Sequence, residues 1–307
     1  MRAASATPRR TRRRSRRIRP RAAHREDFLD DHCYASICPG CLNYRVARAD
    51  RPRSLGVLLS SLPPETKLIT GFNNSIRKPL LARSLTAALE HSDLILFNNR
   101  QNWIDAGRLP GTTCLSNGLD SDIFFVEQPI EHRPWKVVWW GSIGARHVKS
   151  YDEIVLPLAR ELANRGILCE LKLTDSFHAA LTPQEMAVWY NTATHYVCAS
   201  HYEGTPNTAL EAAACGCVVV STPVGDMPDL IDHGRSGYLS RRSVNDFLLW
   251  IVKSSERTRY IEMSREIQQS VARRFWTNVA PDFFALFRKV VSGERADGPS
   301  WLGVLRG

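Results

Sequence analysis

The stretch His195-Tyr-Val-Cys-Ala-Ser-His-Tyr-Glu203-Gly-Thr-Pro-Asn-Thr-Ala-Leu-Glu211-Ala-Ala-Ala-Cys-Gly216-Cys-Val-Val-Val-Ser221 decides the fold of this chain. An apolar run, a polar loop, a helix-forming run and a second apolar run follow one another in it. This order predicts a strand, a loop, a short helix and a buried strand. A unit of this kind predicts a ligand site in the loop, before the helix.

The start of the predicted helix has the chemistry of an anion site. Thr205 can cap the helix and Pro206 suits its first position, so the free N–H groups of Asn207 and Thr208 face whatever lies in front. Glu211 lies one turn further on, on the same face as Thr208, where a carboxylate can accept hydrogen bonds from vicinal hydroxyls such as those of a ribose. A phosphate beside hydroxyls indicates a nucleotide sugar.

Glu203 and Gly204 lie in the loop before the cap. Two glutamates eight residues apart, Glu203 and Glu211, are by themselves more typical of a solvated helix face. The sequence around them favours the functional interpretation.

That surrounding sequence resembles the donor-binding half of the family 4 glycosyltransferases of the GT-B fold, over roughly residues 93–292. Asn117-Gly-Leu-Asp-Ser-Asp-Ile-Phe124 resembles the family's interdomain "NGVD…F" segment, and Gly141 to Lys149 resembles its glycine loop and basic residue. Tyr202-Glu-Gly-Thr-Pro206 resembles the approach to the glutamate pair. The segments Gly216 to Ile231 and Phe275-Trp276 continue the pattern in the expected order.

The resemblance implies an α/β fold with two Rossmann-like domains of the GT-B type, the second a doubly wound parallel sheet. It also implies transfer of a sugar from a nucleoside diphosphate donor with retention of configuration. In this interpretation Glu211 holds the ribose, the amides of Asn207 and Thr208 hold the diphosphate with Lys149, and Glu203 with its loop holds the sugar.

The segment Trp135-Lys-Val-Val-Trp-Trp-Gly141-Ser-Ile-Gly144-Ala-Arg146-His-Val-Lys149 predicts a strand that runs into a glycine loop. At Gly141 and Gly144 the missing side chains let backbone approach a phosphate. Arg146 and Lys149 would neutralise the leaving diphosphate and act as catalytic groups with Glu203. The alternative for both cations is an exposed surface position.

We expect no cofactor and no catalytic metal. Asp120-Ser121-Asp122 has the Asp-x-Asp form that holds divalent cations in another glycosyltransferase fold, but an aspartate pair in an interdomain segment is more typical of a turn. His32, Cys33, Cys38 and Cys41 have ligand types and spacing that could hold zinc or an iron–sulfur cluster, and that alternative is open. The other five cysteines lie in or beside apolar runs and are predicted to be core residues.

The positive charge is concentrated in the N-terminal tail. Residues 1–25 hold 11 of the 41 Lys and Arg and none of the 31 Asp and Glu, so the rest of the chain is nearly neutral. Such a tail cannot bury apolar surface and is expected to be disordered. The open alternatives are contact with an anionic membrane surface, an organelle transit peptide and an extension without function, and nucleic acid is an unlikely partner. No secretory signal or membrane span is evident, which favours a cytoplasmic protein, peripheral at most at the inner membrane face.

The alternation of strands and helices predicts four segments. Residues 1–27 form the basic tail, 28–125 a shortened acceptor-side domain, 126–280 the donor-binding domain, and 281–307 a final helix that crosses back to the first domain. In the first domain, strands are predicted at 54–62, 66–70, 93–97 and 112–116, with helices at 80–91 and near Trp103. A domain this short is truncated, divergent or completed by another chain.

We therefore interpret the chain as a metal-independent, hexosyltransferase-like enzyme with a glycan, lipid or small-molecule acceptor. Two alternatives are open: a nucleotide-sugar epimerase on the same fold, and a non-catalytic subunit that binds nucleotide sugars. The sequence identifies neither the base, the sugar, the acceptor nor the oligomeric state.

Overall fold

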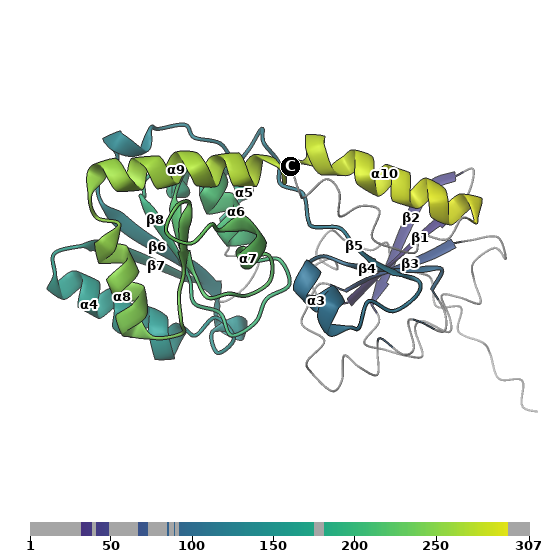
Figure 1. Ribbon diagram of the computed structural model, residues 1–307, viewed down its shortest axis with the longest axis horizontal. Helices are drawn as coiled ribbons and strands as arrows, with labels where there is room; N and C mark the ends of the chain where they lie inside the picture. The colour runs from purple at the N-terminus through teal and green to yellow at the C-terminus, as the bar shows by residue number, and fades with distance from the viewer. Residues whose placement is uncertain are drawn as a thin grey trace, which may run out of the picture.

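The computed structural model describes the backbone of residues 32–38 and 41–48, and residues 67–72, 85, 89, 92–174 and 181–293 in full. Two α/β domains lie side by side, and the helix α10 (Trp276–Ser292) runs along the first of them (Figure 1). The basic tail and the strand predicted at 54–62 lie outside the described residues. Leu85 and Leu89 are helical, within the helix predicted at 80–91.

The second domain is built on a parallel sheet of five strands in the order β10-β9-β8-β6-β7. The strands are β6 (Lys136–Ser142), β7 (Leu168–Thr174), β8 (His195–Cys198), β9 (Val218–Ser221) and β10 (Gly237–Leu239). From β6 the chain moves to β7 on one side and then to β8 on the other. The carboxyl ends of β6 and β8 therefore flank the point where the winding reverses, which is where open α/β sheets bind ligands.

Helices cover both faces of this sheet, as predicted. Because side chains alternate along a strand, Val137 and Trp139 enter one core while Val138 enters the other. The helices α4 (Leu156–Asn164) and α8 (Val244–Lys253) cover the first core. The helices α5 (Pro183–Tyr190) and α6 (Asn207–Ala214) cover the second, and α9 (Arg257–Ala272) reaches both.

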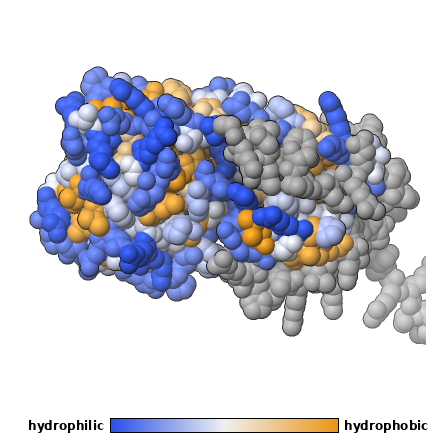
Figure 2. All heavy atoms as spheres, in the orientation of Figure 1, coloured by the Kyte–Doolittle hydropathy of each residue, from blue (hydrophilic) through white to orange (hydrophobic). Residues whose placement is uncertain are grey.

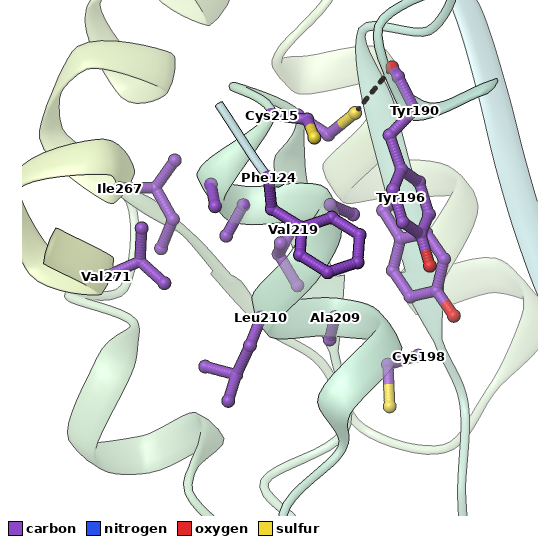
Figure 3. Packing of buried hydrophobic residues seen from close by; sticks show 14 of the residues in the cluster. Phe124, Tyr190, Tyr196, Cys198, Ala209, Leu210, Cys215, Val219, Ile267 and Val271 are labelled. Atoms are coloured by element: carbon purple, nitrogen blue, oxygen red, sulfur yellow. Dashed lines mark hydrogen bonds between the residues drawn. The ribbon is translucent and has the colours of Figure 1, made fainter. Parts of the chain in front are cut away.

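Phe124 anchors the interdomain segment in the second of these cores. Figure 3 shows its ring among side chains of α6, α9 and the sheet, including Leu210, Val219 and Tyr196. The thiol of Cys217 donates to the carbonyl oxygen of Tyr190 at 3.3 Å in the same core. On the face seen in Figure 2, apolar residues lie among hydrophilic ones. The largest fully buried side chains include Trp139, Tyr190 and Tyr196, which lie in the cores of the second domain.

The first domain has a mixed sheet in the order β2-β1-β3-β4-β5. Its strands are β1 (His32–Cys38), β2 (Cys41–Arg48), β3 (Lys67–Phe72), β4 (Leu94–Phe97) and β5 (Thr112–Cys114). The last three are parallel and lie at predicted positions, but β1 is antiparallel to both β2 and β3. Strands at 32–48 were not predicted; a two-residue connection between them can only join antiparallel strands. The helix α3 (Arg100–Asp105) lies near Trp103, as predicted.

The chain crosses back to the first domain beside the interdomain segment. The amide of Leu119 donates to the Arg274 carbonyl at 2.8 Å, and the amide of Trp276 donates to the Leu119 carbonyl at 2.9 Å. A Cβ on Gly118 would lie 2.2 Å from the Trp276 ring, so only glycine fits. From there α10, which begins at Trp276 rather than at Pro281, packs Leu286 and Val290 against Ile69 and Leu94 of the first sheet.

The linker before β6 is fastened by the buried side chain of Arg133, which is 4% exposed. Its Nε donates to the Gln128 carbonyl at 2.8 Å, one Nη donates to the Ala193 carbonyl at 3.0 Å, and the other to Asn191 Oδ1 at 2.8 Å. Burial lowers the pKa of Arg133, against the opposing effects of Cys217, Cys215 and Glu131. The guanidinium joins the linker to the turn between α5 and β8.

Replacing Arg133 with Met should lower the free energy of unfolding by about 2–4 kcal/mol, because buried carbonyl oxygens then lose a charged donor. Urea unfolding followed by circular dichroism measures this. Arg165→Met is the matched control, since Arg165 is exposed and its variant should unfold within about 0.5 kcal/mol of the wild type. Equal stability of the two variants would show that the linker is held by other contacts.

Candidate functional site

Two loops meet at the carboxyl ends of β6 and β8. The loop after β6 contains Lys149 and ends at Ser150, whose φ of 53° is in the left-handed region, before a π-helical turn at Tyr151–Val155. The loop after β8 runs from Ala199 to Pro206 and leads into α6. The amide of His201 donates to the Val148 carbonyl at 2.8 Å and joins the two loops. Left-handed serine and π-helical turns are both costly features that cluster at functional sites.

Lys149 and Glu203 form a close ion pair at the centre of the site. Lys149 Nζ lies 2.5 Å from Glu203 Oε1, and the side chains are 18% and 13% exposed. Ser200 Oγ donates to the same carboxylate oxygen at 2.6 Å. Burial opposes the charge of Lys149, but the charge and hydrogen bond of Glu203 outweigh it, so the pKa of Lys149 is raised. The structure therefore brings these two predicted residues together and keeps the lysine charged.

Glu211 lies one turn into α6, beside two tyrosines of the sheet and α5. The hydroxyl of Tyr190 donates to Glu211 Oε2 at 3.2 Å, and the hydroxyl of Tyr196 donates to Thr208 Oγ1 at 2.8 Å. Burial raises the pKa of Glu211 to about 7, against the opposing effects of the Tyr190 hydrogen bond and the charge of Lys149. A carboxylate that titrates near neutrality is therefore presented on the same helix face as Thr208.

The helix cap differs from the prediction. Thr205 does not cap α6; Pro206 holds the N-cap position, with φ −74° and ψ 78°, and no side chain caps the helix. These angles are those of an inverse γ-turn, in which the amide of Asn207 donates to the Thr205 carbonyl at 2.9 Å. Among the described residues, the amide of Thr208 has no such partner and is the free donor at this end of the helix. The predicted anion site is therefore reduced to one amide.

The hydroxyl of Thr205 instead reaches the first domain. Thr205 Oγ1 lies 3.2 Å from the Asn98 carbonyl oxygen, at the end of β4, and 3.3 Å from Asp226 Oδ2. Asn117 of the interdomain segment adds a second crossing contact, its amide nitrogen lying 3.4 Å from Asn207 Oδ1. The donor loop is therefore held against the first domain.

The glycines of the site differ in how much space surrounds them. A Cβ on Gly141 would lie 2.4 Å from the Trp139 ring, so this glycine makes room for core packing, whereas a Cβ on Gly144 would meet nothing within 4 Å. The tightest approach is at Gly225, where φ is 53° and a Cβ would lie 2.0 Å from the Gly204 carbonyl oxygen. Gly225, which the sequence analysis did not assign to the site, fixes the position of Gly204.

Arg146 is not drawn into the cluster. Its side chain is 46% exposed, pairs with Asp152 through Nε at 2.8 Å and lies over the Tyr151 ring. The hydrogen bond to Asp152 raises the pKa of Arg146. Arg146 therefore lies on the surface beside the glycine loop, whereas Lys149 is the cation that pairs with Glu203.

The aspartate pair forms the predicted turn. Asp120 Oδ1 accepts from the amide of Asp122 at 2.9 Å, and the Asp120 carbonyl accepts from Phe124 at 2.9 Å. Within the described part of the chain, no group of three or more His, Cys, Asp or Glu has a metal-binding arrangement. The side chains of Cys33, Cys38 and Cys41 lie outside that part. The five other cysteines are free thiols, buried or half-buried, as predicted.

The histidines near the site have structural surroundings. His195 is fully buried between Thr194 Oγ1 and Ser254 Oγ, each 2.9 Å away, and burial lowers its pKa to about 3. His147 and His201 stack with ring centroids 5.5 Å apart. The groups that sequence reasoning missed are the backbone carbonyl of Asn98 and the ion pair of Asp226 with Arg274. Their only signal was the position of Asp226 in the run that follows Gly225.

Comparison with known proteins gives this geometry a context. Residues 130–253 match the family model described as "Glycosyl transferases group 1". Alpha-maltose-1-phosphate synthase of Mycolicibacterium smegmatis is 30% identical over 109 residues, which are 33% of this chain and 28% of that protein. The matched residues 130–253 of this chain are thus similar to the group 1 glycosyltransferases. The match to the synthase spans less than a third of the length of that protein.

Solved structures extend the similarity to both domains. Sucrose-phosphate synthase from Thermosynechococcus elongatus superposes with a TM-score of 0.57 at 16% identity, over 71% of this chain and 63% of that one. Anabaena HepE, solved in complex with UDP and glucose, superposes with a TM-score of 0.53 at 15% identity, over 68% of this chain and 66% of that one. The GT-B fold predicted from the sequence is confirmed. In the described residues, no helix has the length and apolar character needed to cross a bilayer.

The raised pKa of Glu211 predicts a pH-dependent stability. The unfolded carboxyl loses its proton near 4.5, while the folded one keeps it until about 7, so the folded state binds more protons between these values. The free energy of unfolding should therefore decrease as the pH rises through this window, by at most about 3 kcal/mol from this group.

Glu211→Gln should remove that decrease, which urea unfolding at pH 5 and pH 8 would measure as a difference from the wild type. Glu262→Gln, on the exposed side of α9, should follow the wild-type curve. Parallel curves for the wild type and Glu211→Gln would contradict the assignment of this titration to Glu211.

Proposed function

We propose that this chain is a retaining, family 4 glycosyltransferase that moves a sugar from a nucleoside diphosphate sugar to a hydroxyl-bearing acceptor. The observation that carries the proposal is the meeting of Lys149, the free Thr208 amide and Glu211 at the point where the sheet reverses its winding. A cation and a helix amide suit a diphosphate, and a half-buried carboxylate suits the two hydroxyls of a ribose.

Each part of the donor has a proposed partner. Glu211 accepts hydrogen bonds from the ribose, the Thr208 amide and Lys149 bind the diphosphate, and Glu203 with Gly204 contacts the transferred sugar. HepE, which shares the fold, was solved with UDP and glucose, and this supports a uridine donor as the first to test. The acceptor, a glycan, lipid or small molecule, binds on the first-domain side of the donor loop, near Asn98.

The chemistry needs little from the protein beyond placement. As the glycosidic bond to the diphosphate breaks, negative charge grows on the leaving phosphate, and the positive charge of Lys149 stabilises it. The acceptor hydroxyl attacks from the same face, and the leaving phosphate takes its proton. This front-face route retains the configuration and requires neither a protein nucleophile nor a divalent cation, so we propose no cofactor and no metal.

A second candidate is a non-catalytic subunit that binds nucleotide sugars. The antiparallel β1 beside β3 favours it, because it departs from a sheet wound in parallel throughout. Donor binding without release of nucleoside diphosphate, with any acceptor or with water, would support this candidate. Isomerised donor as the product would instead support an epimerase.

Replacing Glu211 with Ala should weaken nucleoside diphosphate binding about 10- to 100-fold, since charged hydrogen bonds contribute about 1.5–3 kcal/mol. Calorimetric titration, after a thermal-shift screen of UDP, GDP and ADP, measures this. Glu203→Ala should weaken the intact donor more than the bare nucleoside diphosphate. The exposed Glu262→Ala is the control, and wild-type affinity in Glu211→Ala would refute the ribose assignment.

The two cations of the glycine loop should differ in their effects. Lys149→Met should lower kcat/KM at least about 100-fold, because the leaving diphosphate loses its cation. Arg146→Met should change it only a few-fold, since that guanidinium is exposed and paired with Asp152. A chelator and Asp122→Ala should both leave turnover largely intact. Restoration of a chelated, inactive enzyme by Mn²⁺ would contradict the metal-independent mechanism.

A further inference from the structure

Asp226 is a fully buried carboxylate that the donor site, as described so far, does not use. Its exposed fraction is 0%, and it precedes the short helix α7 (Met227–Leu230). Arg274 Nη1 lies 3.3 Å from its Oδ2, and Thr205 Oγ1 lies 3.3 Å from the same oxygen. The other oxygen, Oδ1, has no hydrogen-bond partner in the described part of the chain. Burying a carboxylate with an unpaired oxygen is costly, so Asp226 is a candidate for a functional role.

The contacts of Asp226 join three parts of the molecule. Thr205 belongs to the donor loop and shares its single hydroxyl proton between Asp226 Oδ2 and the Asn98 carbonyl of the first domain. Arg274 lies two residues after the end of α9, at the crossing between domains, where its own carbonyl accepts from the amide of Leu119. Gly225, directly before Asp226, packs against the Gly204 carbonyl. One carboxylate is thus connected to the donor loop, the crossing and the first domain.

The charges around this group are balanced across elements. Arg274 opposes the effect of burial on Asp226, whereas Asp229 of α7 adds to it, and the pKa of Asp226 is raised to about 6 mainly because it is buried. Asp229 in turn lies 4.0 Å from Arg100 of α3, in the first domain. The ion pair of Asp226 with Arg274 is much better shielded than that of Asp229 with Arg100, since its side chains are 0% and 9% exposed.

We propose that Asp226 is a positioning residue that couples the donor loop, through Thr205, to the junction between the two domains. In terms of the proposed function, on which this role in transfer rests, it places the sugar-binding part of the loop relative to the acceptor side without contacting the donor. The coupling itself is a property of the chain and can be measured without any donor.

The first test uses amide hydrogen exchange of the full chain without ligand. Thr205→Val keeps the shape of the side chain and removes the hydroxyl, so exchange should rise several-fold both in the donor loop, residues 200–208, and across the domain junction in residues 98–105. Thr205→Ser should restore wild-type protection in both. Asp226→Asn should raise exchange in these two segments and also in residues 117–123, where the Leu119 amide donates to the Arg274 carbonyl.

Thr192→Val is the matched control, because the Thr192 hydroxyl also donates to a backbone carbonyl, that of Trp189, and accepts from Lys136 Nζ at 2.6 Å, away from the site. It should change exchange only around its own position and at the start of β6. A change in Thr205→Val that is confined to the donor loop, or spread evenly over the chain, would overturn the coupling. Thr205→Val removes the hydrogen bonds of Thr205 to both Asp226 and Asn98, so the coupling through Thr205 is measured even if Asp226→Asn does not fold.

The second test separates coupling from the proposed function. With a donor sugar that the wild-type chain transfers, Thr205→Val should lower kcat about 10-fold or more, while the Kd of the bare nucleoside diphosphate stays within 2-fold of the wild type. Thr205→Ser should recover kcat. Equal losses in kcat and in nucleotide affinity would overturn the positioning role. If the wild-type chain neither binds a nucleotide nor transfers sugar while the exchange pattern appears as expected, the proposed function fails and the coupling is upheld.

Discussion

The site depends on one topological constraint: the neighbouring strands β6 and β8 send their following helices to opposite faces of the sheet. The chain after β6 forms α4 on one side, and the chain after β8 forms α6 on the other. The two loops therefore lead away from each other, and such a reversal point is where open α/β sheets bind ligands. Lys149 comes from one loop and Glu203 from the other, and the amide of His201 joins the loops at the base.

The ion pair of Lys149 and Glu203 joins the two loops and depends on the burial of both side chains. Two opposite charges that are less than one fifth exposed need each other, because either one alone would be strongly destabilised by its burial. Each therefore stabilises the other before a ligand arrives. The nearby Glu211 accepts a hydrogen bond from the Tyr190 hydroxyl, and burial raises its pKa to about 7. Glu203 is thus paired with a cation, whereas Glu211 titrates near neutrality.

Periodicity and residue chemistry predicted most of the second domain. The apolar runs at β6, β8 and β9 are nearly continuous because parallel strands are buried on both faces, which makes them easy to recognise. The strands β1 and β2 were missed because an antiparallel hairpin with polar and cysteine residues has no such continuous apolar run. Within the site, Lys149 pairs with Glu203 and acts on Glu211, since the three residues follow β6 and β8, which are neighbours in the sheet.

The errors came from interactions that the local sequence does not contain. A threonine before a proline is a good helix cap by its chemistry, but Thr205 has competing acceptors from Asn98 and Asp226, distant in sequence, and the helix begins without a cap. Arg146 had an uncertain register, and its partner Asp152 lies only six residues away on the surface. The requirement for Gly141 similarly arises from the ring of Trp139, which a motif based on phosphates does not describe.

The return of α10 to the first sheet has a consequence for how the molecule is made. Ile69 and Leu94 belong to the domain that leaves the ribosome first, yet their packing partners Leu286 and Val290 follow the entire second domain in sequence. During synthesis this part of the first core is exposed until α10 has emerged. This part of the first core can thus form only after the second domain has been translated, so the folding of the first domain depends on residues that follow the second.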